Sequence, residues 1–424
     1  MARLLTRGHQ AAIAAVERMI AGPTPHAIVI AGQPGVGKTT LALDLAAGLL
    51  CTAEDPAARP CRECRGCRLV EHGSHADLHR IAPSGAGNQI RIGARAEPET
   101  GTVRRLIADL ALLPVEGGAR VAVIEQADRM NEEAQSALLK PLEEPPSGVT
   151  IVLCVDRDDQ LMPTVRSRCV RLRLGPVPVR EIEAILAEQG VSDAPTAARL
   201  ARLSSGRPGL ARAWALAPEA VLARAEIGRS LLDLALDGPA RRLSVGRELL
   251  GRAADVVRAL DRPAPVPDAG TSPRRPRRGV RPTAAPVEPA PAAAGTDANG
   301  EPARGDGDGG GVDRDGDRDG DPAEADARDV RAPAAERRRA AAALVTIWRD
   351  LARDLALVAL GEERHLRDPA LLDDLRAAAD IPTPAIAAFL ARLDRTAELL
   401  EANISPELAI DVLLLAWPRR TRAA

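Results

Sequence analysis

An octapeptide near the N-terminus, GQPGVGKT, has the residue types and spacing of a phosphate-binding loop. Its glycines let backbone N–H groups turn toward phosphate oxygens, and the partial positive charge of a helix N-terminus adds to their attraction. The lysine reaches the outer phosphates and the threonine hydroxyl holds Mg²⁺. The residues expected to contact the nucleotide are Gly32, Gly35, Gly37, Lys38 and Thr39. The spacing therefore predicts a site for ATP with Mg²⁺.

Hydrolysis of a bound triphosphate needs two further groups. A carboxylate on a neighbouring strand must hold the metal ion, and another group must orient the attacking water. After the apolar run 121–124 the sequence continues with Glu125 and Gln126. Glu125 is the candidate on the metal side of the site, although it is longer than the usual aspartate, and Gln126 is an amide where a carboxylate is expected. The pair predicts a site that binds nucleotide yet hydrolyses it poorly.

Four of the six cysteines fall close together, directly after the phosphate loop and its expected helix. Cys51, Cys61, Cys64 and Cys67 are separated by nine, two and two residues. Thiolates at such intervals suit a structural Zn²⁺, which closes a small loop that has no core of its own. Free thiols are the alternative, and disulfides are disfavoured in a reducing compartment. Zinc is the predicted cofactor of this segment.

Other sulfur and imidazole groups are given ordinary roles. Three histidines follow the cysteines, and one of them has the ligand chemistry to replace a cysteine, but four thiolates already fill a tetrahedral shell. These histidines, at positions 72, 75 and 79, are expected on the surface or in packing contacts. Cys154 and Cys169 are expected to be buried thiols.

Alternating strands and helices are expected to position the motifs. Buried strands are predicted at 26–32, 119–124 and 149–155, and helices at 9–22, 39–50, 98–113 and 130–142. Strands that alternate with helices imply a parallel sheet covered on both faces. The phosphate loop then lies between the first strand and the following helix, as its chemistry requires.

Composition sets wider limits. The chain has 424 residues with 45% apolar residues, enough for roughly two or three domains with real cores. One phenylalanine, three tryptophans and no tyrosine mean that Ala, Leu, Val and Ile build these cores. The net charge of −2 gives no global electrostatic reason to expect nucleic-acid binding. Without an apolar run long enough for a membrane span, the chain is expected to be a soluble cytoplasmic protein.

The second half of the chain is helical on both sides of a polar segment. Residues 179–262 and those after 336 have helical apolar spacing. Residues 263–335 are rich in Pro, Ala, Gly, Asp and Arg, and predict a disordered linker. Within it, the run at 313–321, DRDGDRDGD, imitates the spacing of a calcium loop. Its flanks are not amphipathic helices, so solvated low-complexity sequence is the better interpretation.

In order along the chain, residues 26–42, the four-cysteine insertion, NEEAQSALLKPLEEPP at 131–146 and PTVRSRC at 163–169 resemble the bacterial replication clamp loaders of the AAA+ family. The resemblance covers residues 1 to about 215. It implies an α/β AAA+ core with a parallel sheet, a phosphate loop and an inserted zinc module, followed by a helical lid and an all-α C-terminal collar. The implied boundaries are 1–178 for the core with its zinc module at 51–67, 179–217 for the lid, and 218–262 with 336–424 for the collar.

Departures from the motor subunits of this family (gamma/tau) favour the delta prime type, the non-hydrolysing stator. Motor subunits carry an intact Asp-Glu pair where this chain has Glu125 and Gln126. They have a small polar residue near Val155-Asp156 and an arginine where the lid segment has Pro208-Gly209. A self-sufficient motor ATPase remains the alternative, and a small-molecule kinase would have no use for the LLKPLEEPP and SRC motifs.

The resemblance also implies a role for Arg168 of the SRC motif. It would project into the ATP site of a neighbouring motor subunit and neutralise charge in the transition state, so that catalysis occurs in trans. The implied partners are the gamma/tau motor subunits and the delta subunit in a hetero-oligomeric ring, and the sliding clamp and primer-template DNA through that complex. The chain's own ATPase activity is expected to be weak or absent, and the zinc to be structural.

Overall fold

The computed structural model describes residues 2–84, 88–94, 96, 98–116, 118–191, 193–261, 334–402 and 404–420. They belong to one compact unit, formed by residues 1–262 together with 332–424. The predicted linker, with its calcium-like run, lies outside the described residues except for Ala334 and Ala335, which begin a helix.

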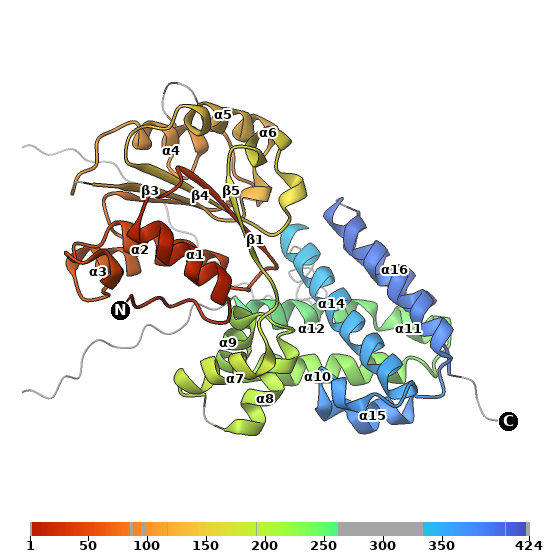
Figure 1. The fold of residues 1–424 in the computed structure, drawn as a ribbon. Helices are drawn as coiled ribbons and strands as arrows, with labels where there is room; N and C mark the ends of the chain where they lie inside the picture. Colours follow the sequence, from red (N-terminus) through yellow and green to blue (C-terminus); the bar gives the residue numbers. More distant parts are fainter. Residues whose placement is uncertain are drawn as a thin grey trace, which may run out of the picture. The chain divides into compact units, whose positions relative to one another are not determined.

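A five-stranded parallel sheet forms the centre of the N-terminal part (Figure 1). Its strands are β1 (Ala27–Gly32), β2 (Leu78–Ile81), β3 (Arg120–Ile124), β4 (Val149–Val155) and β5 (Val170–Leu174), in the order β2-β3-β4-β1-β5. In the register, Ile28 of β1 pairs with Val152 on one side and with Val170 on the other. The parallel sheet confirms the predicted fold class of this part of the chain.

The three predicted strands are β1, β3 and β4, and two edge strands were not predicted. The three are almost wholly buried, and their sequences are unbroken apolar runs because both faces of the sheet are covered. β2 is only four residues long, and β5 alternates arginine with Val and Leu along a largely exposed edge. Neither gives the apolar run that revealed the others.

Helices cover both faces of the sheet (Figure 1). One face carries α1 (Gln10–Ala21), α2 (Lys38–Leu49) and α3 (Arg65–Glu71), and the other carries α4 (Val103–Leu110), α5 (Glu132–Glu143) and the short α6 (Pro163–Arg166). Alternate residues of β1 belong to different cores: Ile28 and Ile30 pack with Leu41 of α2, and Val29 packs with Leu138 of α5. This two-residue period follows from the pleat of the strand.

The predicted helix at 98–113 was too long. α4 begins only at Val103, because Gly101 has a φ of +82° and Thr102 is extended. A left-handed residue followed by an extended one cannot continue a right-handed helix.

Short 3-10 turns lie between the strands at η1 (Pro56–Ala58), η2 (Ala127–Arg129) and η3 (Asp158–Gln160). Two more, η5 (Glu363–His365) and η6 (Pro369–Leu371), lie among the C-terminal helices. Three helices come directly after β5, namely α7 (Val179–Glu188), α8 (Ala194–Leu203) and α9 (Pro208–Leu216). The C-terminal helices are α10 (Pro218–Asp233), α11 (Pro239–Ser244), α12 (Gly246–Leu260), α14 (Ala334–Ala359), α15 (Leu372–Ala377), α16 (Thr383–Glu401) and α17 (Pro406–Ala416).

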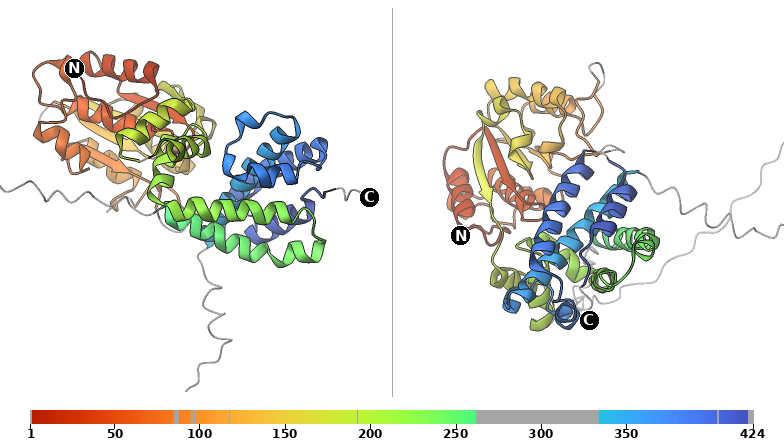
Figure 2. Two further views of the ribbon diagram at one scale, coloured as in Figure 1. Left: turned by 90° about the horizontal axis from the view of Figure 1, so that it is seen from below. Right: turned by 90° about the vertical axis from the view of Figure 1, so that its right-hand side faces the viewer.

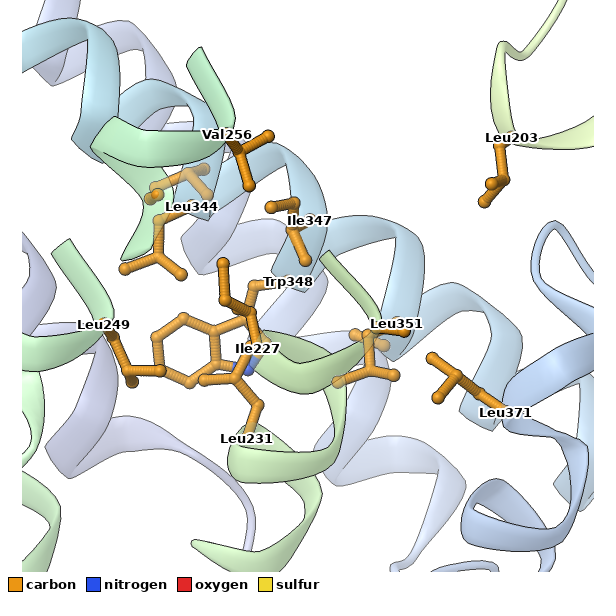
Figure 3. Packing of buried hydrophobic residues seen from close by; sticks show 14 of the residues in the cluster. Leu203, Ile227, Leu231, Leu249, Val256, Leu344, Ile347, Trp348, Leu351 and Leu371 are labelled. Carbon is orange, nitrogen blue, oxygen red and sulfur yellow. The ribbon is translucent and has the colours of Figure 1, made fainter. Parts of the chain in front are cut away.

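The C-terminal helices pack around three of the chain's four aromatic residues. α10 and α12 run side by side (Figure 2), and α14 packs against α12 and α16. Trp348 of α14 lies 5.1 Å from Phe389 and 5.4 Å from Trp417 between ring centroids. Ile227 and Leu249 from the neighbouring helices pack around Trp348 (Figure 3). This helical part fits the predicted all-α C-terminal region. Among the described residues, no helix combines the length and the apolar character that crossing a membrane requires.

Candidate nucleotide site and cysteine cluster

The phosphate loop connects β1 to α2, and its three glycines are sterically required. A Cβ on Gly32 would lie 2.6 Å from the carbonyl oxygen of Leu174 in the neighbouring strand. Gly35 and Gly37 have φ values of +77° and +111°, a region that other residues rarely adopt. The loop therefore has the predicted strand–loop–helix setting, and α2 begins at Lys38 with its first N–H groups lacking partners within the helix.

A cavity of about 650 Å³ opens beside this loop. This volume falls within the usual range for small-molecule and cofactor sites. Loop residues, the N-terminal segment, the end of β3, Asp156 and residues from α7 and α9 line it. The structure thus brings together Gly35, Gly37, Lys38, Thr39 and Glu125 of the predicted site. Gly32 supports the loop from beneath, through its close approach to β5.

Lys38 is already bonded within the protein. Its Nζ donates to the carbonyl oxygens of Gly32 at 2.7 Å and Gln33 at 2.9 Å, and pairs with Asp156 Oδ1 at 2.6 Å. The side chains of Lys38 and Asp156 are only 7% and 18% exposed. All three donors of the ammonium group therefore have partners, and one partner of this lysine, which is expected to contact the outer phosphates, is a carboxylate.

Replacing Asp156 with asparagine is expected to increase the affinity for ATP. A carboxylate about 4 Å from a phosphate charge costs roughly 1 kcal/mol in water and about 4 kcal/mol near a protein surface. These energies correspond to a gain in affinity between about fivefold and several hundredfold, measured by calorimetric titration of the full chain with a non-hydrolysable ATP analogue. Asp159→Asn is the matched control, since Asp159 is 63% exposed and pairs with Arg157. An unchanged or lower affinity of Asp156→Asn would contradict competition between Asp156 and phosphate.

Thr39 and Glu125 form the side of the cavity suited to a metal ion. The Thr39 hydroxyl lies 3.5 Å from Glu125 Oε2, while Glu125 Oε1 pairs with Arg80 of β2 at 2.6 Å. A hydroxyl and a carboxylate oxygen are ligands that Mg²⁺ accepts, so these residues fit the cation that accompanies ATP. Arg80 was not predicted to be here, because it belongs to a strand that the sequence did not reveal.

Gln126 follows Glu125 in an unusual backbone conformation. Its φ and ψ are 49° and 51°, in the left-handed region that residues other than glycine rarely adopt. Such conformations are concentrated at functional sites. The amide side chain has no ionisable group with which to take a proton from water.

The cavity is closed on one side by the N-terminus of α9. The Gly209 N–H donates to the Gly35 carbonyl oxygen at 2.9 Å, and a Cβ on Gly209 would lie 3.0 Å from the same oxygen. A long side chain at position 209 would therefore push α9 away from the phosphate loop. Arg212, one helical turn later, lines the cavity but was not singled out by the sequence, although it lies at the i+3 spacing from Gly209.

Arg168 lies apart from this cavity. It follows α6, its Nη2 pairs with Glu143 Oε1 of α5 at 2.5 Å, and its Nη1 donates to the Thr164 carbonyl oxygen at 2.9 Å. The side chain is 35% exposed, and Arg168 does not occur among the residues that line the cavity in the described part of the chain. Cys169 beside it is only half-buried, whereas Cys154 is buried in the sheet as predicted.

The four predicted cysteines form one cluster. Their Sγ atoms all lie within 4.8 Å of one another, with 3.6 Å between Cys51 and Cys61 and 3.9 Å between Cys51 and Cys64. Sulfur atoms on a Zn²⁺ tetrahedron with bonds of about 2.3 Å are about 3.8 Å apart. The backbone N–H groups of Cys64 and Cys67 each donate to the preceding cysteine's sulfur at 3.3 Å. The cluster fits Zn²⁺, with all four cysteines as ligands.

The environment of the cluster favours thiolate at Cys61 and Cys64 and opposes it at Cys51 and Cys67. Burial opposes ionisation of Cys64, but backbone N–H groups of Cys67 and Thr52 more than compensate and lower its pKa to about 6. Burial raises the pKa of Cys67. His75 is buried and accepts a hydrogen bond from the Asp77 N–H, so it has a structural role as predicted.

Comparison with known proteins relates the first half of the chain to bacterial DNA polymerase III subunits. Residues 8–178 match the family described as DNA polymerase III, delta subunit. DNA polymerase III subunit delta' of Pseudomonas aeruginosa is 35% identical over 185 residues, which cover 43% of this chain and 53% of that protein. Subunit delta' of Escherichia coli is 33% identical over 193 residues, 46% of this chain and 55% of that protein.

Subunit tau of Escherichia coli is also similar, with 33% identity over 190 residues that cover 44% of this chain and 28% of that protein. The chain spans about half the length of the delta' relatives that it matches. In each of these three comparisons the aligned segment is shorter than half of this chain.

Proposed function

Because residues 8–178 relate this chain to the clamp loader subunits of the AAA+ type in bacterial DNA polymerase III, we propose that it works as a subunit of the delta prime type. In this role it takes part in the ATP-driven loading of the sliding clamp on primed DNA. It supplies an arginine to a neighbouring motor subunit and does not itself hydrolyse ATP at a useful rate.

One contrast within the chain carries the proposal. Arg168 has the position and exposure to act outside its own cavity, because its side chain is 35% exposed and its ion pair with Glu143 lies at the surface. The chain's own cavity has an amide at Gln126, and its lysine is neutralised by Asp156. Arg168 is therefore available to another subunit's site. In the chain's own site, a carboxylate is missing at position 126 and Lys38 is engaged by Asp156.

The chemistry suits arginine. Its guanidinium stays charged at every physiological pH, and its planar fork can contact two phosphate oxygens at once. When it reaches the neighbouring ATP, Arg168 would exchange the Glu143 carboxylate for the γ-phosphate, a partner of the same charge sign. Before the subunits meet, the ion pair with Glu143 would keep the Arg168 side chain in one orientation at the surface.

The helices α7–α9 act in this proposal as the lid of the AAA+ core, and the C-terminal helices as the collar that joins the ring. The partners are the gamma/tau motor subunits and the delta subunit, and the clamp and primer-template DNA are reached through the assembled complex. Such a role places the protein in the cytoplasm. Zn²⁺ at the four cysteines has a structural part only.

The second candidate is a self-sufficient motor ATPase of the gamma/tau type. The observation in its favour is the complete phosphate loop with Thr39 and Glu125 adjacent, together with the similarity to subunit tau. Against it stand Gln126, Asp156 and the contact of Gly209 with Gly35, each of which replaces or obstructs a group that a motor would need.

The test uses the purified full chain with and without motor subunits. We expect the chain alone to turn over ATP at a negligible rate, even at nucleotide concentrations that saturate any binding. Adding it to the motor and delta subunits is expected to give a complex whose ATPase responds to the clamp and primed DNA. Brisk turnover by the isolated chain would select the motor interpretation, and failure to enter the complex would reject both.

A further inference from the structure

We infer that the cysteine cluster positions a wall of the nucleotide cavity, and that Arg62 and Asp44 transmit this effect. The segment that they hold is Arg3–Arg7, named here the N-terminal strap. The part of this inference that concerns nucleotide binding rests on the proposed function, whereas the part that concerns the strap does not.

The strap forms part of the cavity. Leu5, Thr6 and Arg7 line it together with residues of the phosphate loop. Two residues after the strap, His9 Nε2 lies 3.0 Å from the carbonyl oxygen of Val36 in the phosphate loop. A shift of the strap would therefore change the cavity and disturb the loop.

Asp44 holds the strap from beneath. It lies on α2, its side chain is fully buried, and it accepts hydrogen bonds from the Leu5 N–H at 3.0 Å and the Thr6 N–H at 2.8 Å. The Thr6 hydroxyl donates to the same carboxylate at 2.7 Å. Because Asp44 belongs to the helix that begins with Lys38, it ties the strap to the element that presents the phosphate loop.

The counter-charge of Asp44 comes from the cysteine cluster. Arg62 lies between Cys61 and Cys64, pairs with Asp44 through Nη2, and donates from Nε to the Arg3 carbonyl oxygen at 3.0 Å. Its side chain is 11% exposed, and it also lines the cavity. Arg62 thus contacts the strap, Asp44 and the cavity at once.

The backbone explains why this arginine depends on the cysteines. Arg62 has a φ of +64°, a conformation that costs a non-glycine residue free energy and persists only where the surroundings impose it. The residue on its N-terminal side and the second residue after it are both members of the cluster. A metal ion on these thiolates would hold both ends of the turn, and with them the direction of the Arg62 side chain.

Loss of Arg62 leaves a specific defect. Asp44 would remain buried with its charge uncompensated, which is the costly half of a broken buried ion pair. Solvation would stabilise this unpaired carboxylate, so its movement toward water would weaken its hydrogen bonds to the strap. Loss of metal should act in the same direction, because it releases the turn that aims Arg62.

The experiment measures hydrogen exchange of the Leu5 and Thr6 amides in the full chain, since Asp44 accepts from both. Zinc content and affinity for a non-hydrolysable ATP analogue are measured on the same samples. We expect one zinc per chain, and stripping it with a chelator should speed exchange at both amides by about tenfold or more. Arg62→Ala should give the same change with its zinc still bound. In that variant, stripping the zinc should add little further exchange at the strap.

Two variants separate this effect from general damage to the segment. Arg65→Ala removes a 71%-exposed arginine of the same segment that pairs with Glu116, and should leave strap exchange unchanged. Arg62→Lys keeps a charge near Asp44 without the fork, and should fall between wild type and Arg62→Ala. Equal exchange at the strap in wild type and Arg62→Ala would overturn the inference, and so would a chain that purifies without zinc.

The nucleotide measurement has its own outcomes. Where wild type binds the ATP analogue, Arg62→Ala and the stripped protein are expected to bind it at least about threefold more weakly. If they bind equally well, the strap does not control the cavity and that part of the inference fails. If wild type binds no nucleotide while the exchange results hold, nucleotide binding is removed from the proposed function and the link from cluster to strap stands.

Discussion

Under the proposed function, Arg168→Ala is expected to slow ATP hydrolysis at a neighbouring motor site by about 10³-fold or more, the range in which such arginines act in trans. The variant loses the charge and both phosphate contacts while its own fold persists. Arg168 is a surface residue whose protein partners are Glu143, Thr164 and Ser167. The measurement is single-turnover hydrolysis in a reconstituted loader in which the other motor sites are inactivated, so that one interface is observed alone.

Three comparisons make this result specific. Arg168→Lys keeps the charge without the planar fork and should recover only part of the rate. Arg173→Ala removes an arginine that is 74% exposed on β5 and pairs with Asp158, and should leave the rate unchanged. Complex formation and thermal unfolding of this subunit should be the same for all three variants. An unchanged rate in Arg168→Ala would remove the assignment of this residue.

The strands that the sequence predicted well are those that are buried on both faces of the sheet. β1, β3 and β4 are buried on both faces, so each is an apolar run whatever its neighbours are. β5 has a mixed pattern, because one of its sides is the edge of the sheet, and β2 is too short for any period to show. Their membership of the sheet depends on pairing with distant residues, which no local pattern contains.

The same division applies to the candidate site. The phosphate loop and the four cysteines were found because each is a local motif. In such a motif the spacing along the chain is enough to predict that the residues lie close together. The pairs Lys38–Asp156 and Glu125–Arg80 join residues that are far apart in the sequence and lie on different elements, and nothing in the sequence indicated that they meet. These long-range pairs modify the motif, since one engages the lysine and the other engages the acid beside the metal position.

Cys64→Ser is expected to remove nearly all zinc from the purified chain, leaving less than about a tenth of the wild-type content. A structural zinc site of four thiolates gains apparent binding free energy of about 10–16 kcal/mol. Serine has nearly the same volume as cysteine but is not a thiolate ligand. The pKa of Cys64 is lowered to about 6, and its sulfur accepts the Cys67 N–H, so its loss affects a neighbouring ligand as well. Zinc content is measured by elemental analysis of the dialysed protein.

The matched control is Cys169→Ser, which replaces a half-buried thiol outside the cluster and keeps a donor to the Val165 carbonyl oxygen. It should retain full zinc and wild-type stability. Few large apolar side chains lie between Cys51 and Cys67, so without the metal little else holds the four sulfur atoms together. We therefore expect the Cys64→Ser chain to be cleaved in this segment by a protease that leaves wild type intact. Protection from cleavage despite the loss of zinc would mean that Asp44 and Arg62 hold the segment without a metal, and would reverse the direction of dependence between the two.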